Sequence, residues 1–174
     1  MAKINARIQV SSGGALAAAA LLLFAEPRHL PALLGAALIH ELGHIAALKL
    51  CRAELIELRL EFFGLCLIST AATTPMREAL CTLAGPLAGL LWTLFIRKLA
   101  PLSAAFSLLL SAYNLLPALP LDGGRALLAL CGRRWPLRLT GALCSLAVLS
   151  LAMWAPLPML LFPAFWLWLE ALKA

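Results

Sequence analysis

Three ionisable side chains lie close together in a segment of the chain that is otherwise apolar. His40, Glu41 and His44 stand within the run LIHELGHIAALKL, residues 38–50. On a helix, residues four apart share one face, so the two imidazoles can converge on one metal ion, and the glutamate points near the same place. Neutral imidazoles bind Zn²⁺, and a neighbouring carboxylate can accept a proton from water on the metal. The spacing therefore predicts a hydrolytic zinc centre.

The apolar surroundings of this motif strengthen the prediction. In a soluble protein, the same spacing also arises by coincidence on an exposed helix. Within a membrane span, an ionisable side chain costs at least about 2–3 kcal/mol and is rarely kept without a role. Three such groups within five residues need an internal partner, and a divalent cation would compensate them.

The only aspartate of the chain, Asp122, is the candidate for a third metal ligand. A catalytic zinc commonly takes three protein ligands and leaves one position to water. Asp122 follows a long apolar run, in NLLPALPLDGGRALL, and is expected at the same membrane depth as His44. An Asp-Gly-Gly sequence also suits a turn or a helix cap, so this structural role is the alternative.

The composition predicts a membrane protein. Of 174 residues, 63% are hydrophobic and only 13% are charged, whereas a soluble domain has about 25% charged residues. Uncharged runs such as 79–96 and 101–121 approach the roughly 20 residues that a helix needs to cross the hydrocarbon core. We predict six membrane spans, at residues 10–25, 31–50, 79–96, 101–121, 139–155 and 157–172.

The basic residues predict the orientation of these spans. If both termini lie in the cytoplasm, all Lys and Arg residues except Arg28, Arg97 and Lys98 fall on the cytoplasmic side, as the positive-inside rule requires. The net charge of +6 is therefore attributed to topology and to anionic lipid headgroups, and nucleic acid is not expected as a partner. The expected location is the cell membrane, with a multi-pass topology.

Two segments outside the spans favour strands. Residues 54–69 contain two apolar-rich runs around Gly64, which predict a β-hairpin between the second and third spans, with a helix as the alternative. Residues 4–10 alternate apolar and polar side chains and indicate a short strand. The expected fold is an all-α polytopic membrane protein of about six transmembrane helices with one short hairpin, forming a single domain over residues 1–174.

Three short motifs together resemble a known family. HELGH, then AGPLAG, then NLLPALPLDGG is similar in order to the site-2 protease family of intramembrane zinc metalloproteases, above all to the bacterial branch typified by the stage IV sporulation protein FB. The resemblance covers nearly the whole chain in the order of its elements. It implies an intramembrane zinc metalloendopeptidase that cuts a membrane-associated protein.

The resemblance assigns roles to individual residues. It implies that His40, His44 and Asp122 bind zinc and that Glu41 is the general base. It also implies that Asn114, with Pro117 and Pro120, lines the substrate cleft. For Asn114, donation to the oxyanion of the reaction and a structural hydrogen bond between helices are both open. The glycines of AGPLAG favour close helix packing over a direct chemical role.

The resemblance leaves the partners open. It suggests regulated intramembrane proteolysis of a sigma-factor precursor in sporulation, and an anti-sigma factor is compatible with the same chemistry. A membrane regulator or inhibitor protein is a further expected partner, whereas neither a CBS nor a PDZ domain is expected. A metal-ion transporter and an inactive scaffold are the other functions considered. A transporter usually has repeated halves or several polar spans, and an inactive relative usually lacks the glutamate or a ligand.

Overall fold

The computed structural model describes residues 7–12, 15, 19, 26–53, 55–61, 64–69, 74–154 and 161–173. The first predicted span, residues 10–25, falls largely outside these described residues. The described part is mostly helical, with six helices and three strands. The elements are β1 (Arg7–Val10), α2 (Leu30–Leu50), β2 (Leu55–Glu61), β3 (Gly64–Ser69), α3 (Pro75–Ile96), α4 (Pro101–Asn114), α5 (Asp122–Cys131), α6 (Trp135–Trp154) and α7 (Leu161–Lys173).

Three of the described helices, α2, α3 and α6, are long and apolar enough to cross a membrane by length and composition. They contain 21, 22 and 20 residues, which corresponds to about 30 Å each. Their bounds agree with the predicted spans 31–50, 79–96 and 139–155 within a few residues. The helix α3 begins earlier than predicted because Pro75 opens its first turn and the Thr74 hydroxyl accepts a hydrogen bond from the Arg77 amide.

The predicted span 101–121 is not one continuous helix. The helix α4 ends at Asn114 after 14 residues, about 21 Å, which is too short to cross the roughly 30 Å of hydrocarbon alone. Pro117 and Pro120 lack backbone donors and disfavour helix in the residues before them. Residues 115–121 form a loop, and Asp122 then begins α5. The last helix, α7, has 13 residues, against the predicted 157–172.

The strands form one three-stranded sheet in the order β1-β2-β3. β1, which lies within the predicted strand at residues 4–10, pairs with β2 in parallel. β2 pairs with β3 antiparallel, with Leu58 opposite Leu67. The described fold is mostly helical, as expected, and it contains a small sheet in which β1 joins β2 and β3. The parallel pair was not expected because it joins segments that lie far apart in the sequence.

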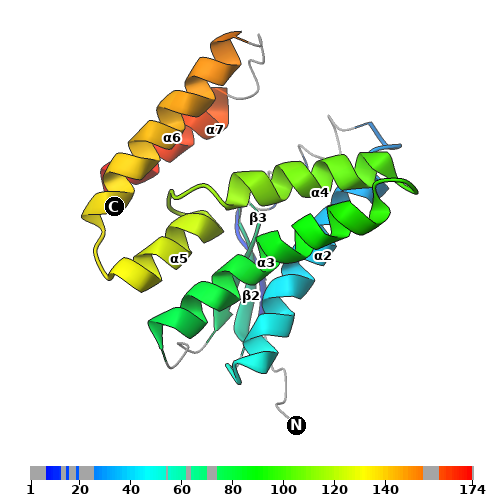
Figure 1. The fold of residues 1–174 in the computed structure, drawn as a ribbon, viewed down its shortest axis with the longest axis horizontal. Helices are drawn as coiled ribbons and strands as arrows, with labels where there is room; N and C mark the ends of the chain where they lie inside the picture. Colours follow the sequence, from blue (N-terminus) through cyan, green and yellow to red (C-terminus); the bar gives the residue numbers. More distant parts are fainter. Residues whose placement is uncertain are drawn as a thin grey trace.

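The helices form two groups (Figure 1). In the first group, α3 packs against α2, α4 and α5, and α2 also contacts α4. In the second group, α6 and α7 form a hairpin that lies beyond α5. A small apolar core of Ala118, Leu121 and Leu167 joins the loop at residues 115–121 to α7. This loop therefore links the two groups and leads directly into Asp122.

Candidate metal centre

The helix α2 presents both of its histidines on its buried face. The exposed fractions of His40 and His44 are 5% and 7%. Their rings meet edge to face, with centroids 4.9 Å apart, and the two Nε2 atoms are separated by 3.2 Å. The predicted convergence of the two imidazoles is therefore present in the structure.

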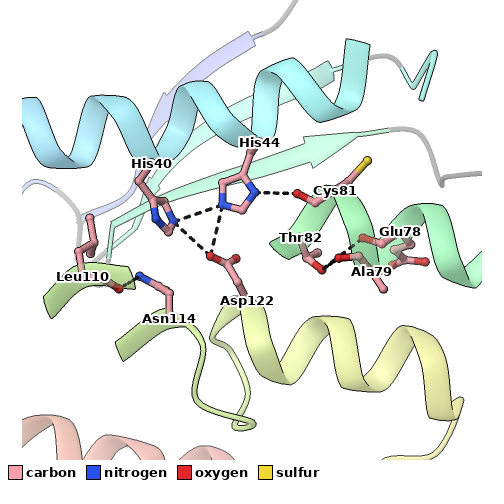
Figure 2. Close-up of polar contacts among 9 residues, drawn as sticks. All are labelled: His40, His44, Glu78, Ala79, Cys81, Thr82, Leu110, Asn114 and Asp122. Atoms are coloured by element: carbon pink, nitrogen blue, oxygen red, sulfur yellow. Dashed lines mark hydrogen bonds and ion pairs between the residues drawn. The ribbon is translucent and has the colours of Figure 1, made fainter. Parts of the chain in front are cut away.

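The helix α5 brings Asp122 to the same point. Asp122 is the first residue of α5 and is 8% exposed. Its Oδ2 atom lies 3.1 Å from His40 Nε2 and 3.2 Å from His44 Nε2, as Figure 2 shows. His40 and Asp122 are 82 residues apart in the sequence. The helices α2 and α5 thus place three possible ligand atoms in a compact triangle.

The triangle fits a tetrahedral metal ion. Zinc holds nitrogen and oxygen ligands at about 2.0–2.1 Å, which at tetrahedral angles places neighbouring ligand atoms about 3.3 Å apart. The three separations here are 3.1, 3.2 and 3.2 Å. Two imidazoles and one carboxylate also form a donor set that catalytic zinc accepts. His40, His44 and Asp122 can therefore hold a divalent cation.

A main-chain contact sets the orientation of His44. Its Nδ1 atom donates a hydrogen bond to the carbonyl oxygen of Cys81 on α3, at 2.8 Å (Figure 2). With the proton on Nδ1, the lone pair of Nε2 faces His40 and Asp122. Metal-binding histidines commonly have this kind of supporting contact. In the described residues, Nδ1 of His40 is buried without such a partner.

The Asp122 carboxylate is buried in contact with both imidazoles. A buried carboxylate that remains charged must be compensated nearby. A bound divalent cation would supply that compensation between the three side chains.

Glu41 has a buried carboxylate oxygen beside this triangle. The residue is half-buried, and its Oε2 atom has no hydrogen-bond partner among the described residues. An unpaired buried oxygen is costly unless it serves a ligand, water or a reacting group. Glu41 is thus free to act as a base next to the candidate metal centre.

Two glycines bring α2 and α3 into close contact at the centre. A Cβ atom added at Gly85 would lie 2.2 Å from His44 Nε2, and one added at Gly43 would lie 2.5 Å from the carbonyl oxygen of Ala84. Gly85 belongs to the AGPLAG motif, so the packing role predicted for that motif is confirmed. Only glycine lets the α3 backbone lie directly against the His44 ring.

Two more glycines hold the start of α5. A Cβ atom at Gly123 would lie 2.3 Å from the Leu115 carbonyl oxygen, and one at Gly124 would lie 2.4 Å from that of Ala118. The loop at residues 115–121 therefore wraps closely around the first turn of α5. This packing positions Asp122, so the Asp-Gly-Gly sequence serves the geometry of the metal centre as well as the start of a helix.

The residues predicted to line a substrate cleft lie on α4 and the loop. Asn114 is half-buried, and its Nδ2 donates to the Leu110 carbonyl oxygen in the same helix, at 3.0 Å (Figure 2). The Pro117 carbonyl oxygen accepts a hydrogen bond from Thr140 on α6, and Pro120 is exposed. None of these described contacts joins the three residues to His40, His44 or Asp122.

Sequence reasoning missed three contributors to the centre. The Cys81 carbonyl leaves no trace in the sequence because any residue supplies the same group. Thr140, which holds the loop through Pro117, stands in an apolar run without a motif. The close-packing role of Gly43 has only a weak signal in the sequence: it is the small residue of HELGH and directly precedes His44.

Comparisons with known proteins identify the fold. No family model and no curated protein sequence matches the chain. Among solved structures, the site-2 protease from Methanocaldococcus jannaschii is similar, with a TM-score of 0.71 and 19% sequence identity. The alignment covers 99% of this chain and 93% of that structure. The chain therefore has the fold of that protease over almost its whole length.

Proposed function

We propose that the chain is an intramembrane zinc metalloprotease that hydrolyses a peptide bond in a membrane-associated protein. The observation that carries this proposal is the buried triangle of His40, His44 and Asp122 next to the unpaired carboxylate oxygen of Glu41. The similarity of the fold to a site-2 protease supports it. The sporulation branch of the family is the more specific part of the proposal and depends on the sequence motifs alone.

Each residue of the centre has a defined task. His40, His44 and Asp122 would hold a zinc ion, which supplies an acidified water molecule and polarises the scissile carbonyl. Glu41 would accept a proton at its free carboxylate oxygen and then deliver it to the leaving amine. Asn114 can donate to the oxyanion only after its amide leaves Leu110, so the structure supports its helix-bonding role more directly.

The position of the centre suits a reaction that needs water inside a membrane. We place α2, α3 and α6 across the cell membrane in a multi-pass arrangement of about six spans with both termini in the cytoplasm. Lys49, five residues after His44, is exposed and marks the cytoplasmic end of α2. Five helical residues correspond to about 7.5 Å, which is a short path for water and protons.

The sheet provides a means to hold an extended substrate. A helical substrate must be unwound before attack because its carbonyls are occupied by its own hydrogen bonds. Within the described residues, β3 is an edge strand of the sheet and is paired on one side only, by β2. An extended segment of a membrane-associated protein, such as a sigma-factor precursor or an anti-sigma factor, can add to such an edge.

The replacement Glu41→Gln tests this function. The variant keeps all three metal ligands, so we expect the zinc content of the wild type and a loss of cleavage on the order of 100–10,000-fold. Metal is measured by atomic emission on purified protein, and cleavage by immunoblotting of a co-expressed substrate. Glu26→Gln, at an exposed acidic residue paired with Arg28, is the matched control. Cleavage by Glu41→Gln at the wild-type rate would falsify the proposal.

The same variant can identify the substrate. Membranes from cells with the wild type and with Glu41→Gln are compared by quantitative proteomics. A precursor that accumulates only with the variant would be the substrate, and its shortened form in the wild type would give the cleavage position. Zinc binding without any difference between the two membrane proteomes would favour the inactive scaffold.

A further inference from the structure

One end of the α6–α7 hairpin collects basic side chains. Arg133 and Arg134 precede α6, and Arg138 lies in the first turns of that helix; all three are exposed. The C-terminal end of α7, with Lys173, lies beside the start of α6 (Figure 1). Four cationic groups therefore gather at the same end of the hairpin.

Three of these charges have no partner among the described residues. Lys173 donates to Glu170 at 2.8 Å and lies over the Trp166 ring. In the part of the chain that the structure describes, Arg133, Arg134 and Arg138 form neither ion pairs nor side-chain hydrogen bonds. This end of the hairpin thus presents guanidinium groups with free donors and is suited to an anionic ligand.

A hollow with apolar walls begins at Arg138. Its volume is about 180 Å³, and it lies between α6 and α7. The helices approach closely next to it, because a Cβ atom added at Gly141 would lie 3.1 Å from that of Ala171. The combination of small and large side chains leaves a groove with a cationic rim, lined by Arg138, Ala142, Trp168, Ala171 and Leu172.

The position of the hollow along α6 corresponds to the headgroup region of a bilayer. Trp135 and Trp154 begin and end this helix and are 62% and 86% exposed. Exposed tryptophans about 30 Å apart are typical of the two interfacial belts of a membrane. Arg138 lies three residues after Trp135, about 4.5 Å along the axis, so its long side chain can reach the phosphate level at this end of the helix.

We propose that this end of the hairpin binds an anionic glycerophospholipid. The phosphate contacts Arg138, with Arg133 and Arg134 adding positive charge, and the first part of an acyl chain fills the hollow over Ala142 against Trp168. The apolar walls argue for a lipid over free phosphate, which would contact the guanidinium groups alone. The proposal depends on the membrane placement given under the proposed function and is independent of the protease activity.

Lipid retention tests this inference. Purified protein is reconstituted in nanodiscs of equal phosphatidylglycerol and phosphatidylcholine, and native mass spectrometry measures the lipids that remain bound on release. The wild type should retain phosphatidylglycerol preferentially. Arg138→Gln should lower this retention by about fivefold, the effect of one basic residue at an anionic surface. Equal retention of both lipids by the wild type would overturn the proposal.

Two further variants separate a built site from general charge attraction. Arg97→Gln removes an exposed arginine at the distant end of α3, and retention should stay unchanged. Ala142→Trp fills the hollow while every charge remains, and retention should fall. An equal effect of Arg97→Gln and Arg138→Gln would contradict the site. If Ala142→Trp does not fold, the comparison of the two exposed arginines decides the question.

Competition with inorganic phosphate tests whether the lipid is held by the charge of its headgroup alone. Millimolar phosphate added before release should leave the bound phosphatidylglycerol in place, because the hollow contributes to its binding. Displacement by phosphate alone would overturn the lipid proposal. None of these variants touches His40, Glu41, His44 or Asp122, so a negative result here leaves the zinc content and the Glu41→Gln test unaffected.

Discussion

The candidate metal centre and the α6–α7 hairpin are held together by different means. At the centre, Gly43 and Gly85 allow direct contact of two helices, and buried polar groups meet each other. In the hairpin, Leu137 and Leu167 are fully buried, and Ser145 donates one hydrogen bond to the Ala164 carbonyl oxygen at 2.7 Å. The centre therefore depends on precise backbone approach, whereas the hairpin depends mainly on apolar packing.

The connection between these two regions is limited. The helices α6 and α7 pack chiefly on each other. They meet the rest of the described structure mainly through the loop at residues 115–121, where Ala118 and Leu121 pack on Leu167 and Thr140 donates to the Pro117 carbonyl, and α6 also contacts α5. We therefore expect changes at the centre to affect metal binding strongly, and changes in the hairpin to affect it mainly through this loop.

Replacement of Asp122 by alanine should give the largest effect. The change removes one of the three proposed metal ligands, and we expect zinc affinity to fall by at least on the order of 100-fold, since loss of a mere supporting contact costs about 10–100-fold. Zinc per chain is measured by atomic emission after gel filtration. Glu170→Gln, an acidic residue of the hairpin, is the control and should retain the metal. Full zinc occupancy in Asp122→Ala would remove this residue from the coordination shell.

Replacement of Gly85 by alanine should have an intermediate effect at the same centre. The new methyl group would meet the His44 ring at 2.2 Å, so the ring or α3 must shift. Such overpacking costs about 1–3 kcal/mol, and the displaced ring should also lower zinc affinity. Thermal unfolding and zinc content report the two effects.

Gly35→Ala in α2 is the matched control for this change. A Cβ atom at position 35 has no neighbour within 4 Å, so neither unfolding nor zinc binding should be impaired. If both glycine variants behave alike, close contact between α2 and α3 does not determine the geometry of His44.

Replacement of Thr140 by valine should have the smallest effect. Valine keeps the shape but cannot donate to the Pro117 carbonyl, and such hydrogen bonds between membrane segments contribute about 0.6 kcal/mol on average. Amide hydrogen exchange should increase in residues 115–121 while zinc content stays the same. Ser150→Ala removes a hydroxyl that donates to the Leu146 carbonyl oxygen within α6 and should leave the loop unchanged. A loss of zinc in Thr140→Val would show that hairpin and centre are tightly coupled.

The motif residues could be located from the sequence because their chemistry is rare in an apolar chain. His40 and His44 have helical spacing, and Asp122 is the only aspartate of the chain. Few sets of three candidate metal ligands were therefore possible. The long helices could be predicted for a similar reason, since a run of about 20 uncharged residues usually indicates a membrane-spanning helix. Composition and spacing were therefore enough to predict the clustering of these three residues and the long helices, because each of these features depends on a short stretch of sequence or on a rare residue type.

The remaining features depend on tertiary contacts that a local pattern does not contain. Hydropathy does not distinguish a membrane span from the partly buried loop at residues 115–121, because both lack charged residues. The prolines of that loop were noted, but the glycines that pack it against α5 act through backbone atoms of distant residues. The pairing of β1 with β2 likewise joins residues about 50 positions apart.

The contact between His44 and the Cys81 carbonyl has a consequence for how this protein can vary. A histidine oriented by a main-chain atom makes no chemical demand on the side chain at that position, and the buried place of Cys81 limits only the size of a replacement. Alanine scanning would overlook the contact, because alanine supplies the same carbonyl group. The bond can be probed chemically by exchanging the peptide for an ester at residue 82, which weakens the acceptor without altering any side chain.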